Sequence, residues 1–427
     1  MNRRLQTQGA ERGSVLMVTL FMVGLLGFFL FSYLYLIRTQ RTMVARSQAW
    51  NATLPMAEAG VEEALAQLNP GAPHPIVDRS SNGWGSPAAG FYGPVSRRLT
   101  AGSYSVLFST DSQPVIYSTG YVTIPEMSVV LSRTIRVTTT NTPLFMVGMA
   151  AKQNIDLKGN NVGANSFDSM DPNLSTNGRY DSTKTSTNGD IASVLGLVNV
   201  GNADIYGSLL LGSTATDSIN NNGFVTGGVT NDFNVDFPDV ILPKASWLPA
   251  TPLLLPSLID GVLYNYAFGT LGGLPGGDYV LSGLNGNLYI GTNTSVRLLI
   301  NGNASPGVIR VAGPGAGARL TIYMNGSSFA LSGQTTADGG NALNLSYYGT
   351  TNNTSISFNG NASFTGTIYA PEASFTLGGG GNNTYDFVGA SVTQSVTMNG
   401  HFNFHFDENL LRNGPQLGYN ATSWSEL

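Results

Sequence analysis

The chain contains no cysteine and little charge. Among its 427 residues there are no Cys, 3 His and only 11% charged residues, against about 25% in an ordinary soluble domain. The missing thiols exclude disulfides, thiolate zinc sites, iron–sulfur clusters and cysteine nucleophiles. The low charge argues against a Lys/Glu-rich helical cytosolic enzyme. The hydrophobic content of 42% argues against a disordered chain.

The few charges are unevenly distributed along the chain. Residues 1–140 contain 11 Lys/Arg and 7 Asp/Glu, whereas residues 141–427 contain 9 and 18. The basic side chains therefore cluster around the N-terminal hydrophobic segment, and the larger remainder is mildly acidic. Because phosphate backbones are bound through basic stripes, which this remainder lacks, we expect no nucleic-acid partner.

A long apolar segment follows a short leader-like segment, residues 1–14. Residues 15–37 contain no charged side chain, and these 23 residues would form a helix of about 34 Å, enough to cross a hydrocarbon core of about 30 Å. Arginines lie on both sides of the segment, so the positive-inside rule leaves its orientation open. The sequence therefore predicts a transmembrane helix, and an ordinary single-span anchor is one interpretation of it.

The helical pattern continues over residues 38–70. Apolar side chains recur there at helical steps and would form one stripe: Trp50, Leu54, Val61, Leu65 and Leu68. Pro55 should kink or interrupt this helix, because proline lacks an N–H and clashes with the preceding turn. Asn69-Pro70-Gly71 then ends it. We expect an amphipathic extension that docks onto a globular head.

Two short motifs flank the apolar run. Residues 11–16 read ERGSVL before it, and residues 56–64 read MAEAGVEEA after it. They resemble the N-terminus of type IV pilin-like proteins, most closely the PilX-type minor pilins. The resemblance implies an inner-membrane helix with its head in the periplasm, which packs with other pilin-like subunits in a cell-surface pilus or a pseudopilus. It also implies that prepilin peptidase cuts after Gly13 and leaves Ser14 as the first residue, although Val18 stands where major pilins carry Glu.

The next segment, residues 71–144, is predicted to form a small antiparallel β module. Residues 71–100 are rich in Pro, Gly and Ser and resemble a loop. Alternating apolar and polar residues then predict strands over 103–109, 115–124 and 129–140, although Arg133 falls on the apolar face of the last. We expect a three-stranded meander under the helix, which resembles the compact sheet of pilin-like heads.

From about residue 145 the chain consists of short alternating strands punctuated by Gly and Asn. Several strands end at Asn-Gly steps, which we expect to supply a positive φ at sharp corners: Asn301-Gly302, Asn325-Gly326, Asn359-Gly360 and Asn399-Gly400. Their separations of 24, 34 and 40 residues exclude a strict short repeat. The sequence predicts a mostly β protein whose largest part is an irregular β-solenoid, with a β-sandwich as the alternative.

Five prolines over residues 238–256 interrupt these repeats. Because proline cannot donate to a sheet ladder, we expect a surface connector between a first repeat region, 145–237, and a second, 257–413. Residues 414–427 would be a C-terminal tail. The stretch 364–371, FTGTIYAP, resembles the β domain found behind many PilX-type anchors, which has no established activity.

Three polar residues near the C-terminus could bind a metal ion. His401, His405 and Asp407 alternate along one predicted strand, so their side chains could share a face. Two imidazoles and a carboxylate are ligands that zinc accepts. The same alternation predicts a plain polar outer face opposite three phenylalanines, and we favour that interpretation, with no metal and no cofactor.

Other candidate sites rest on weaker patterns. Two groups could ligate calcium through oxygen atoms, namely Asp168, Asp171 and Asn173, and separately Asp232, Asp236 and Asp239. Neither has EF-hand spacing, and such residues in Gly-rich loops usually form turns. The Gly-rich residues 312–317 lack the Lys-Ser/Thr of a phosphate-binding loop, so they indicate a surface turn.

Three functions fit these patterns. The first, which we favour, is a membrane-anchored minor pilin-like structural subunit whose β-rich head serves assembly or adhesion to a glycan or surface protein. The second is a carbohydrate-active β-helix enzyme, but residues 261–427 contain only four Arg and no Lys, so catalytic charge is scarce. We therefore expect no enzyme. The third is a signal-anchored surface protein unrelated to pili.

Overall fold

The chain folds into two compact units, of which the first combines one long helix with a β-sheet and the second is mostly β. The computed structural model describes residues 12–69, 83–124, 127–159, 162–220, 222–243, 245–270, 272–313, 317–333, 335–337, 341–359, 363–379 and 384–427. Unit 1 comprises Met1–Leu68, Asp78–Thr140 and Asn420–Leu427, and unit 2 comprises Asn69–Val77 and Asn141–Tyr419. Almost all of unit 2 is therefore inserted into the chain of unit 1. The leader-like segment lies mostly outside the described residues.

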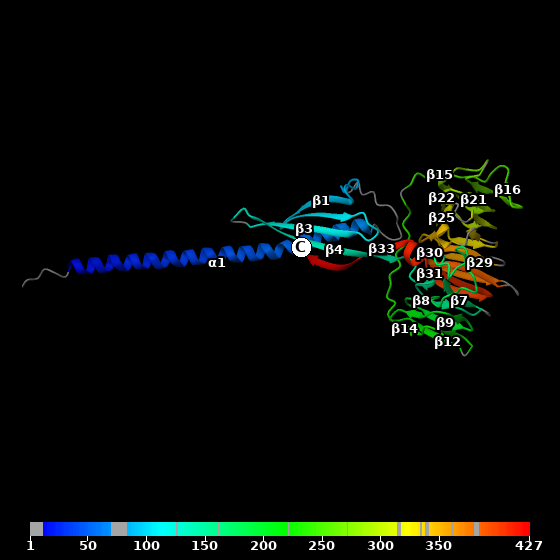
Figure 1. Cartoon of the computed structure of the whole chain (residues 1–427), viewed down its shortest axis with the longest axis horizontal. Coiled ribbons are helices and arrows are strands. Elements are labelled where there is room, and N and C mark those ends of the chain that lie inside the picture. The colour runs from blue at the N-terminus through cyan, green and yellow to red at the C-terminus, as the bar shows by residue number, and fades with distance from the viewer. Residues whose placement is uncertain are drawn as a thin grey trace, which may run out of the picture. The chain divides into compact units, whose positions relative to one another are not determined.

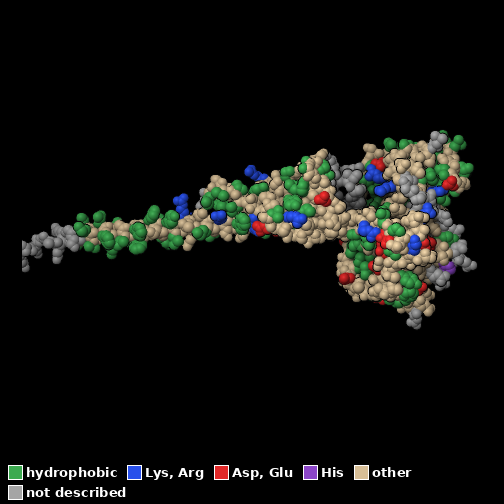
Figure 2. Space-filling model, in the orientation of Figure 1, with side chains coloured by type: hydrophobic (Ala, Val, Ile, Leu, Met, Phe, Trp, Pro, Cys, Tyr) green, Lys and Arg blue, Asp and Glu red, His purple; other side chains and the backbone are tan. Residues whose placement is uncertain are grey.

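Helix α1 (Arg12–Leu68) is continuous (Figure 1). Its most apolar stretch has a mean hydropathy of 2.5 and no residue buried against the rest of the chain, so by length and composition it could cross a membrane. Figure 2 shows hydrophobic side chains along the visible face of this part of the helix. The predicted interruption at Pro55 is wrong, because one lost amide donor is outweighed by the packing of the adjacent turns against a sheet.

An antiparallel sheet forms the rest of unit 1. Its strands lie in the order β1 (Phe91–Leu99), β2 (Gly102–Ser109), β3 (Val115–Thr123), β4 (Val130–Pro143) and β33 (Gln416–Glu426). The three predicted strands are confirmed as β2, β3 and β4, and the helix ends at Leu68 as predicted.

Two strands of this sheet were not expected from the sequence. Strand β1 lies in the stretch that was predicted to be a loop. Its register shifts between Tyr92 and Val95, and this shift breaks the alternation that would have indicated a strand. Strand β33 lies in the expected C-terminal tail. Its residues are exposed from Asn420 to Glu426, so no apolar alternation marks it. Both are edge strands, where one side of the ladder has no partner strand in the described sheet.

Small residues let α1 lie close against the sheet. Ala57, Val61 and Ala64 are completely buried in this contact. A Cβ on Gly60 would lie 2.2 Å from Ser118 Oγ, and a Cβ on Gly120 would lie 2.1 Å from the Thr53 carbonyl oxygen. The Ala-Glu-Ala-Gly stretch of the helix therefore owes its composition to close packing on β3.

Polar contacts at this helix–sheet contact fix its register. Glu63 accepts hydrogen bonds from Arg97 at 2.9 Å and from the Tyr104 hydroxyl at 2.7 Å. Burial, together with the bond to Glu63, raises the pKa of Tyr104 to about 12. Arg133, which broke the predicted apolar face, lies 5.2 Å from the Trp50 ring centroid and pairs with Glu426. The arginine is on the apolar face because it stacks on a helix aromatic.

Unit 2 is a coil of short strands stacked in parallel on three faces. Each turn of the coil is called a rung. A rung runs through face C, then face A, then face B, and every strand pairs in parallel with its neighbour one rung away. The parallel pairing is what stacked rungs require, whereas a β-sandwich would pair its strands mainly antiparallel.

The strands of each face stack in a fixed spatial order. Face A contains β19 (Gly277–Leu281), β22 (Ser295–Ile300), β25 (Arg319–Met324), β28 (Leu345–Gly349), β30 (Phe364–Gly379), β31 (Tyr385–Gly400), β5 (Met149–Ala151), β8 (Ile191–Ser193), β11 (Leu209–Leu211) and β14 (Val229–Thr230). Face B contains β20 (Leu284–Asn285), β23 (Ala304–Ser305), β26 (Ser328–Leu331), β29 (Ser355–Asn359), parts of β30 and β31, β6 (Ile155–Asp156), β9 (Leu197–Gly201) and β12 (Thr216–Ile219). Face C contains β18 (Tyr266–Phe268), β21 (Leu288–Ile290), β24 (Ile309–Val311), β27 (Thr335–Ala337), parts of β30 and β31, β32 (Phe402–Asp407), β7 (Gly163–Phe167), β10 (Asp204–Ile205) and β13 (Phe224–Val225).

Several short elements lie outside these faces. They are β15 (Leu248–Pro249), the hairpin strands β16 (Ser257–Ile259) and β17 (Val262–Tyr264), and the helices η1 (Ala342–Asn344) and α2 (Leu410–Asn413), with β15 pairing onto β19.

One rung is built from both ends of the unit 2 sequence. Strand β31 pairs with β32 on face C, with β5 on face A and with β6 on face B. We call β32, β5 and β6 the closing rung. From it the chain first builds β7 to β14 towards one end, then crosses to β15 and builds β18 to β32 back towards the closing rung. Figure 1 shows β12 and β14 at one end of the unit and β15 at the other.

Apolar side chains from all three faces fill the coil. A stack of aromatic rings runs along the inside of face C, with 5.0 Å between the centroids of Phe364 and Phe387 and 4.4 Å between those of Phe387 and Phe404. Corner glycines permit close rung spacing, since a Cβ on Gly326 would lie 2.0 Å from the Gly302 carbonyl oxygen. The expected positive φ is found at Gly400 but not at Gly302 or Gly326, so close approach is what those corners require.

The segment that crosses between the two ends, residues 231–243, forms a strap over the outside of face A. Phe233, Phe237 and Val240 are buried there among side chains of the face A strands. The Tyr369 hydroxyl donates a hydrogen bond of 2.7 Å to the Pro238 carbonyl oxygen. The predicted proline-rich connector thus begins within a segment that is packed through its aromatic residues.

Candidate functional site

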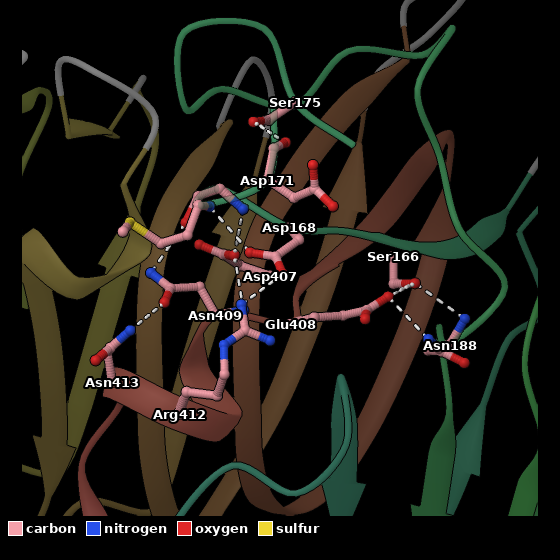
Figure 3. A network of polar contacts seen from close by, with 12 residues as sticks. Ser166, Asp168, Asp171, Ser175, Asn188, Asp407, Glu408, Asn409, Arg412 and Asn413 are labelled. Carbon is pink, nitrogen blue, oxygen red and sulfur yellow. Dashed lines mark hydrogen bonds and ion pairs between the residues drawn. The ribbon is translucent and has the colours of Figure 1, made fainter. Parts of the chain in front are cut away.

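Several of the polar residues singled out in the sequence, among them Asp168, Asp171, His405 and Asp407, lie at or beside the corner between faces C and A next to the closing rung. There the chain leaves β32 into α2, and a long loop, residues 168–190, leaves β7 (Figure 3). Asp407, at the end of β32, is completely buried. Its Oδ1 accepts hydrogen bonds from the backbone amides of Ser169 at 3.0 Å and Asn409 at 3.2 Å. Asp407 therefore fastens the loop to β32.

A second carboxylate reinforces this corner. Asp168 pairs with Arg412 of α2 at 2.5 Å and accepts a bond from the Met170 amide. Burial and the nearby charge of Asp168 raise the pKa of Asp407. Asn409 links the two elements again, because its side-chain amide donates to Ser169 Oγ at 3.1 Å. Figure 3 shows these groups converging from the loop, β32 and α2.

Glu408 points to the other side of β32. It accepts hydrogen bonds from Ser166 Oγ at 2.7 Å and from the side-chain amide of Asn188 at 3.0 Å. Asp407, the last residue of β32, and Glu408, which follows it in a turn, thus bind different partners. Each carboxylate holds one part of the 168–190 loop, so their contacts are those of a structural clasp.

His405 lies next to this clasp, under the same loop. Its Nδ1 is 2.6 Å from Asn165 Oδ1, its Nε2 is 3.2 Å from Asp386 Oδ1, and only 3% of its side chain is exposed. The Tyr180 ring stacks on the imidazole, with 3.6 Å between centroids. The histidine is therefore held by Asn165 and Asp386, which come from the rungs on either side of β32. Its ring in turn supports the ring of Tyr180, which comes from the loop.

Tyr180 and Asp386 line an open cavity of about 870 Å³. The other lining residues all come from the loop: Thr176, Asn177, Arg179, Asp181 and Ser182. Burial opposes ionisation of Asp386, but the hydrogen bond and charge of His405 outweigh it and lower the pKa of the carboxyl. Hydrogen bonds from Thr176 and Thr183 lower the pKa of Asp181 to about 2. The cavity thus presents two carboxylates, a guanidinium, hydroxyls and an aromatic ring.

The structure separates the three residues considered as metal ligands. His405 is engaged by Asn165 and Asp386, and Asp407 by backbone amides. The backbone carbonyl of His401 accepts a hydrogen bond from the Tyr385 amide. In the part of the chain that the structure describes, no group of three or more His, Cys, Asp or Glu residues is placed to hold a metal ion.

The residues considered for calcium or phosphate binding make other contacts wherever the structure describes them. Asp168 and Asp171 cap turns, because each accepts a bond from the backbone amide two residues later. Asp236 and Asp239 lie close enough to Tyr369 to contribute to raising its pKa, after the larger effect of burial. Residues 314–316 of the Gly-rich stretch lie outside the described residues. Gly13 and Ser14 lie in the first turn of α1.

Sequence reasoning missed Tyr180, Asp386 and Asn165. Each looks like an ordinary residue of a Gly/Asn-rich stretch, and only rung register brings them together. His405 pairs with Asn165 across one strand ladder, and Asn403 with Asp386 across the next. The irregular repeat length hides this register, because the loop between β7 and β8 is much longer than the other corners.

Comparisons with known proteins match only parts of the chain or match it weakly. The family model described as "Domain of unknown function (DUF7305)" matches residues 274–413, the stretch from β19 to α2. No curated protein sequence matches the chain. Among solved structures, the chain is similar to the competence-associated pilin ComZ from Thermus thermophilus, with 12% identity, a TM-score of 0.30, and coverage of 89% of this chain and 97% of that chain. At this TM-score two chains need not share a fold, so the match assigns nothing to this protein.

Proposed function

We propose that the protein is a membrane-anchored, pilin-like structural subunit. The observation that carries the proposal is α1 itself. Residues 15–37 of this helix contain no charged side chain and are not packed against the rest of the chain, and its C-terminal part packs on the sheet of unit 1. An exposed apolar helix of this length needs lipid or other apolar helices around it. A continuous helix that is docked on the sheet at one end can lie first in lipid and later among the helices of other subunits.

The resemblance at residues 11–16 and 56–64 makes the proposal more specific. It supports a PilX-type minor pilin, held in the inner membrane by α1 with the sheet of unit 1 and all of unit 2 in the periplasm, and able to join other pilin-like subunits in a pilus or pseudopilus. The role of Gly60 in the contact between α1 and β3 is consistent with a motif selected for helix packing.

N-terminal sequencing tests the processing step that this proposal requires. We expect the mature chain to begin at Ser14, both in isolated membranes and in sheared pili. The Gly13→Leu variant should remain unprocessed, because the substitution removes the small residue before the cut. Absence of the Ser14 start from cells with active prepilin peptidase would exclude the pilin route.

A matched variant separates cleavage from general damage to the leader. Gly9→Leu introduces the same side chain four residues upstream. It should be processed as efficiently as the natural chain, with the same Ser14 start. Equal loss of processing in both variants would mean that Gly13 is not the site of the cut.

The cavity beside Tyr180 supports adhesion to a saccharide as the role of the head. Ionised carboxylates accept hydrogen bonds from sugar hydroxyls, Arg179 donates them, and an aromatic ring suits the apolar face of a sugar. We expect the full chain in detergent micelles to bind neutral oligosaccharides on a glycan array. Asp386→Asn should weaken binding about tenfold, and Asp217→Asn, on exposed β12, should not. Equal binding by Asp386→Asn and the natural chain would contradict the assignment.

A further inference from the structure

One end of the unit 2 coil is left open. Strands β12, β13 and β14 each pair with a strand of the preceding rung, and among the described residues no strand pairs with their outer sides. The chain leaves the coil here and enters the strap. The backbone amides and carbonyls on these outer sides form an unfilled parallel ladder, which favours the addition of another strand.

The opposite end of the coil is covered by the chain itself. Strand β15 pairs with β19, and the Leu253 amide donates a hydrogen bond of 2.8 Å to the Asn265 carbonyl oxygen in front of β18. Coils of stacked rungs usually need such a cover at both ends. The covered end also prevents a second copy from stacking its β18–β20 rung directly onto the open end.

The open end is acidic as well as unpaired. Residues 212–232, which contain the three outer strands, include two Asp and no Lys or Arg. Asp217 of β12 and Asp232, just after β14, are exposed. Between these carboxylates lie partly exposed apolar side chains, with Ile219 at 41%, Phe224 at 39% and Val229 at 40% exposure. Two copies meeting through this end would bring like charges together, so self-association there is disfavoured.

We propose that β12, β13 and β14 form a docking edge for a basic segment of a partner protein that is extended along each strand and bends at the corners between the faces. The partner's backbone would continue the parallel ladder, its lysines or arginines would face Asp217 and Asp232, and its apolar side chains would cover Phe224 and Val229. Strand addition explains the missing cover, and charge complementarity selects the partner. The proposal does not depend on membrane anchoring or on the saccharide cavity.

Binding of a defined peptide tests this edge. The probe is a fluorescent eight-residue peptide of alternating lysine and valine. The control is a peptide of the same length and pattern in which glutamate replaces lysine. Fluorescence anisotropy with the full chain in detergent micelles should show binding of the lysine peptide and at least about tenfold weaker binding of the glutamate peptide. Equal affinity for the two peptides would overturn the proposal.

Two double variants locate the binding. Asp217→Lys/Thr230→Lys places lysines on the open edge and should weaken lysine-peptide binding at least about tenfold. Ser355→Lys/Asn399→Lys introduces the same number of lysines on β29 and β31, which are paired on both sides, and should leave binding unchanged. Equal weakening by the two variants would mean nonspecific charge attraction and would overturn the docking edge.

Hydrogen exchange distinguishes strand addition from simple charge attraction. The bound lysine peptide should slow amide exchange by at least about tenfold in whichever of β12, β13 and β14 it joins, because paired amides exchange only on opening. Unchanged exchange would overturn strand addition. In sedimentation experiments without peptide, Asp217→Lys/Thr230→Lys and the natural chain should show the same state of association. The opposite result would replace the basic partner with a second copy.

Discussion

The Gly120→Val substitution is expected to break the packing of α1 against the sheet of unit 1. A Cβ at this position would lie 2.1 Å from the Thr53 carbonyl oxygen and 2.6 Å from the Ala57 amide nitrogen. Both are backbone atoms of the helix, so no side-chain rotation relieves the clash and the helix or the strand must move. We expect unit 1 to lose about 3 kcal/mol or more of its free energy of unfolding.

Limited proteolysis of the full chain in detergent micelles measures this loss. Cleavage within β2 and β3 should accelerate in Gly120→Val, while cleavage within unit 2 should be unchanged. Gly24→Val is the matched control, because a Cβ on Gly24 meets nothing within 4 Å. If β3 were as protected in Gly120→Val as in the natural chain, the close contact between α1 and β3 would be wrong.

The Phe404→Ala substitution is expected to open the closing rung of unit 2. Phe404 is 2% exposed and stacks on Phe387 with 4.4 Å between ring centroids. It comes from β32, which joins β31 on one side to β7 on the other. Removing a buried ring of this kind costs about 3–5 kcal/mol. A loss of that size should lower the melting temperature of unit 2 by roughly 10 °C.

Thermal unfolding and hydrogen exchange check this result together. Amides of β7 and β31 should lose protection in Phe404→Ala before those of β22 and β25, because the damage lies between the two halves of the coil. Phe224→Ala, at a phenylalanine that is 39% exposed, is the control and should change the unfolding free energy by no more than about 0.5 kcal/mol. Equal melting temperatures for Phe404→Ala and the natural chain would contradict the closing rung.

Local sequence patterns were sufficient to predict those elements of unit 1 that have one buried and one exposed face. The apolar stripe of α1 and the alternation of β2, β3 and β4 predicted those elements because each has one buried side. Strands β1 and β33 escaped prediction for the opposite reason. A register shift breaks the alternation of β1, and the residues of β33 from Asn420 onward are exposed, so burial imposed no pattern on their sequence.

The polar cluster beside the closing rung shows where sequence reasoning stops. Alternation correctly placed Phe402 and Phe404 in the interior of the coil, but the polar outer face that it predicted is wrong, because His405 and Asp407 are buried. It could not show that His405 lies between Asn165 and Asp386, since those contacts cross from one rung to the next. Nor could it show that Asp407 is buried, because only the return of the 168–190 loop covers it.

By itself, the sequence determined the apolar helix, its amphipathic extension, the β-rich composition and the small residues at tight corners. Each of these follows from interactions between residues close together in the chain. The tertiary structure alone decided that β32, β5 and β6 complete one rung, that the strap lies on face A, and that β12, β13 and β14 remain open. Those outcomes depend on pairing between segments separated by up to about 240 residues. Loops of variable length leave such pairing unmarked in the sequence, and the fit of side chains within the coil selects it.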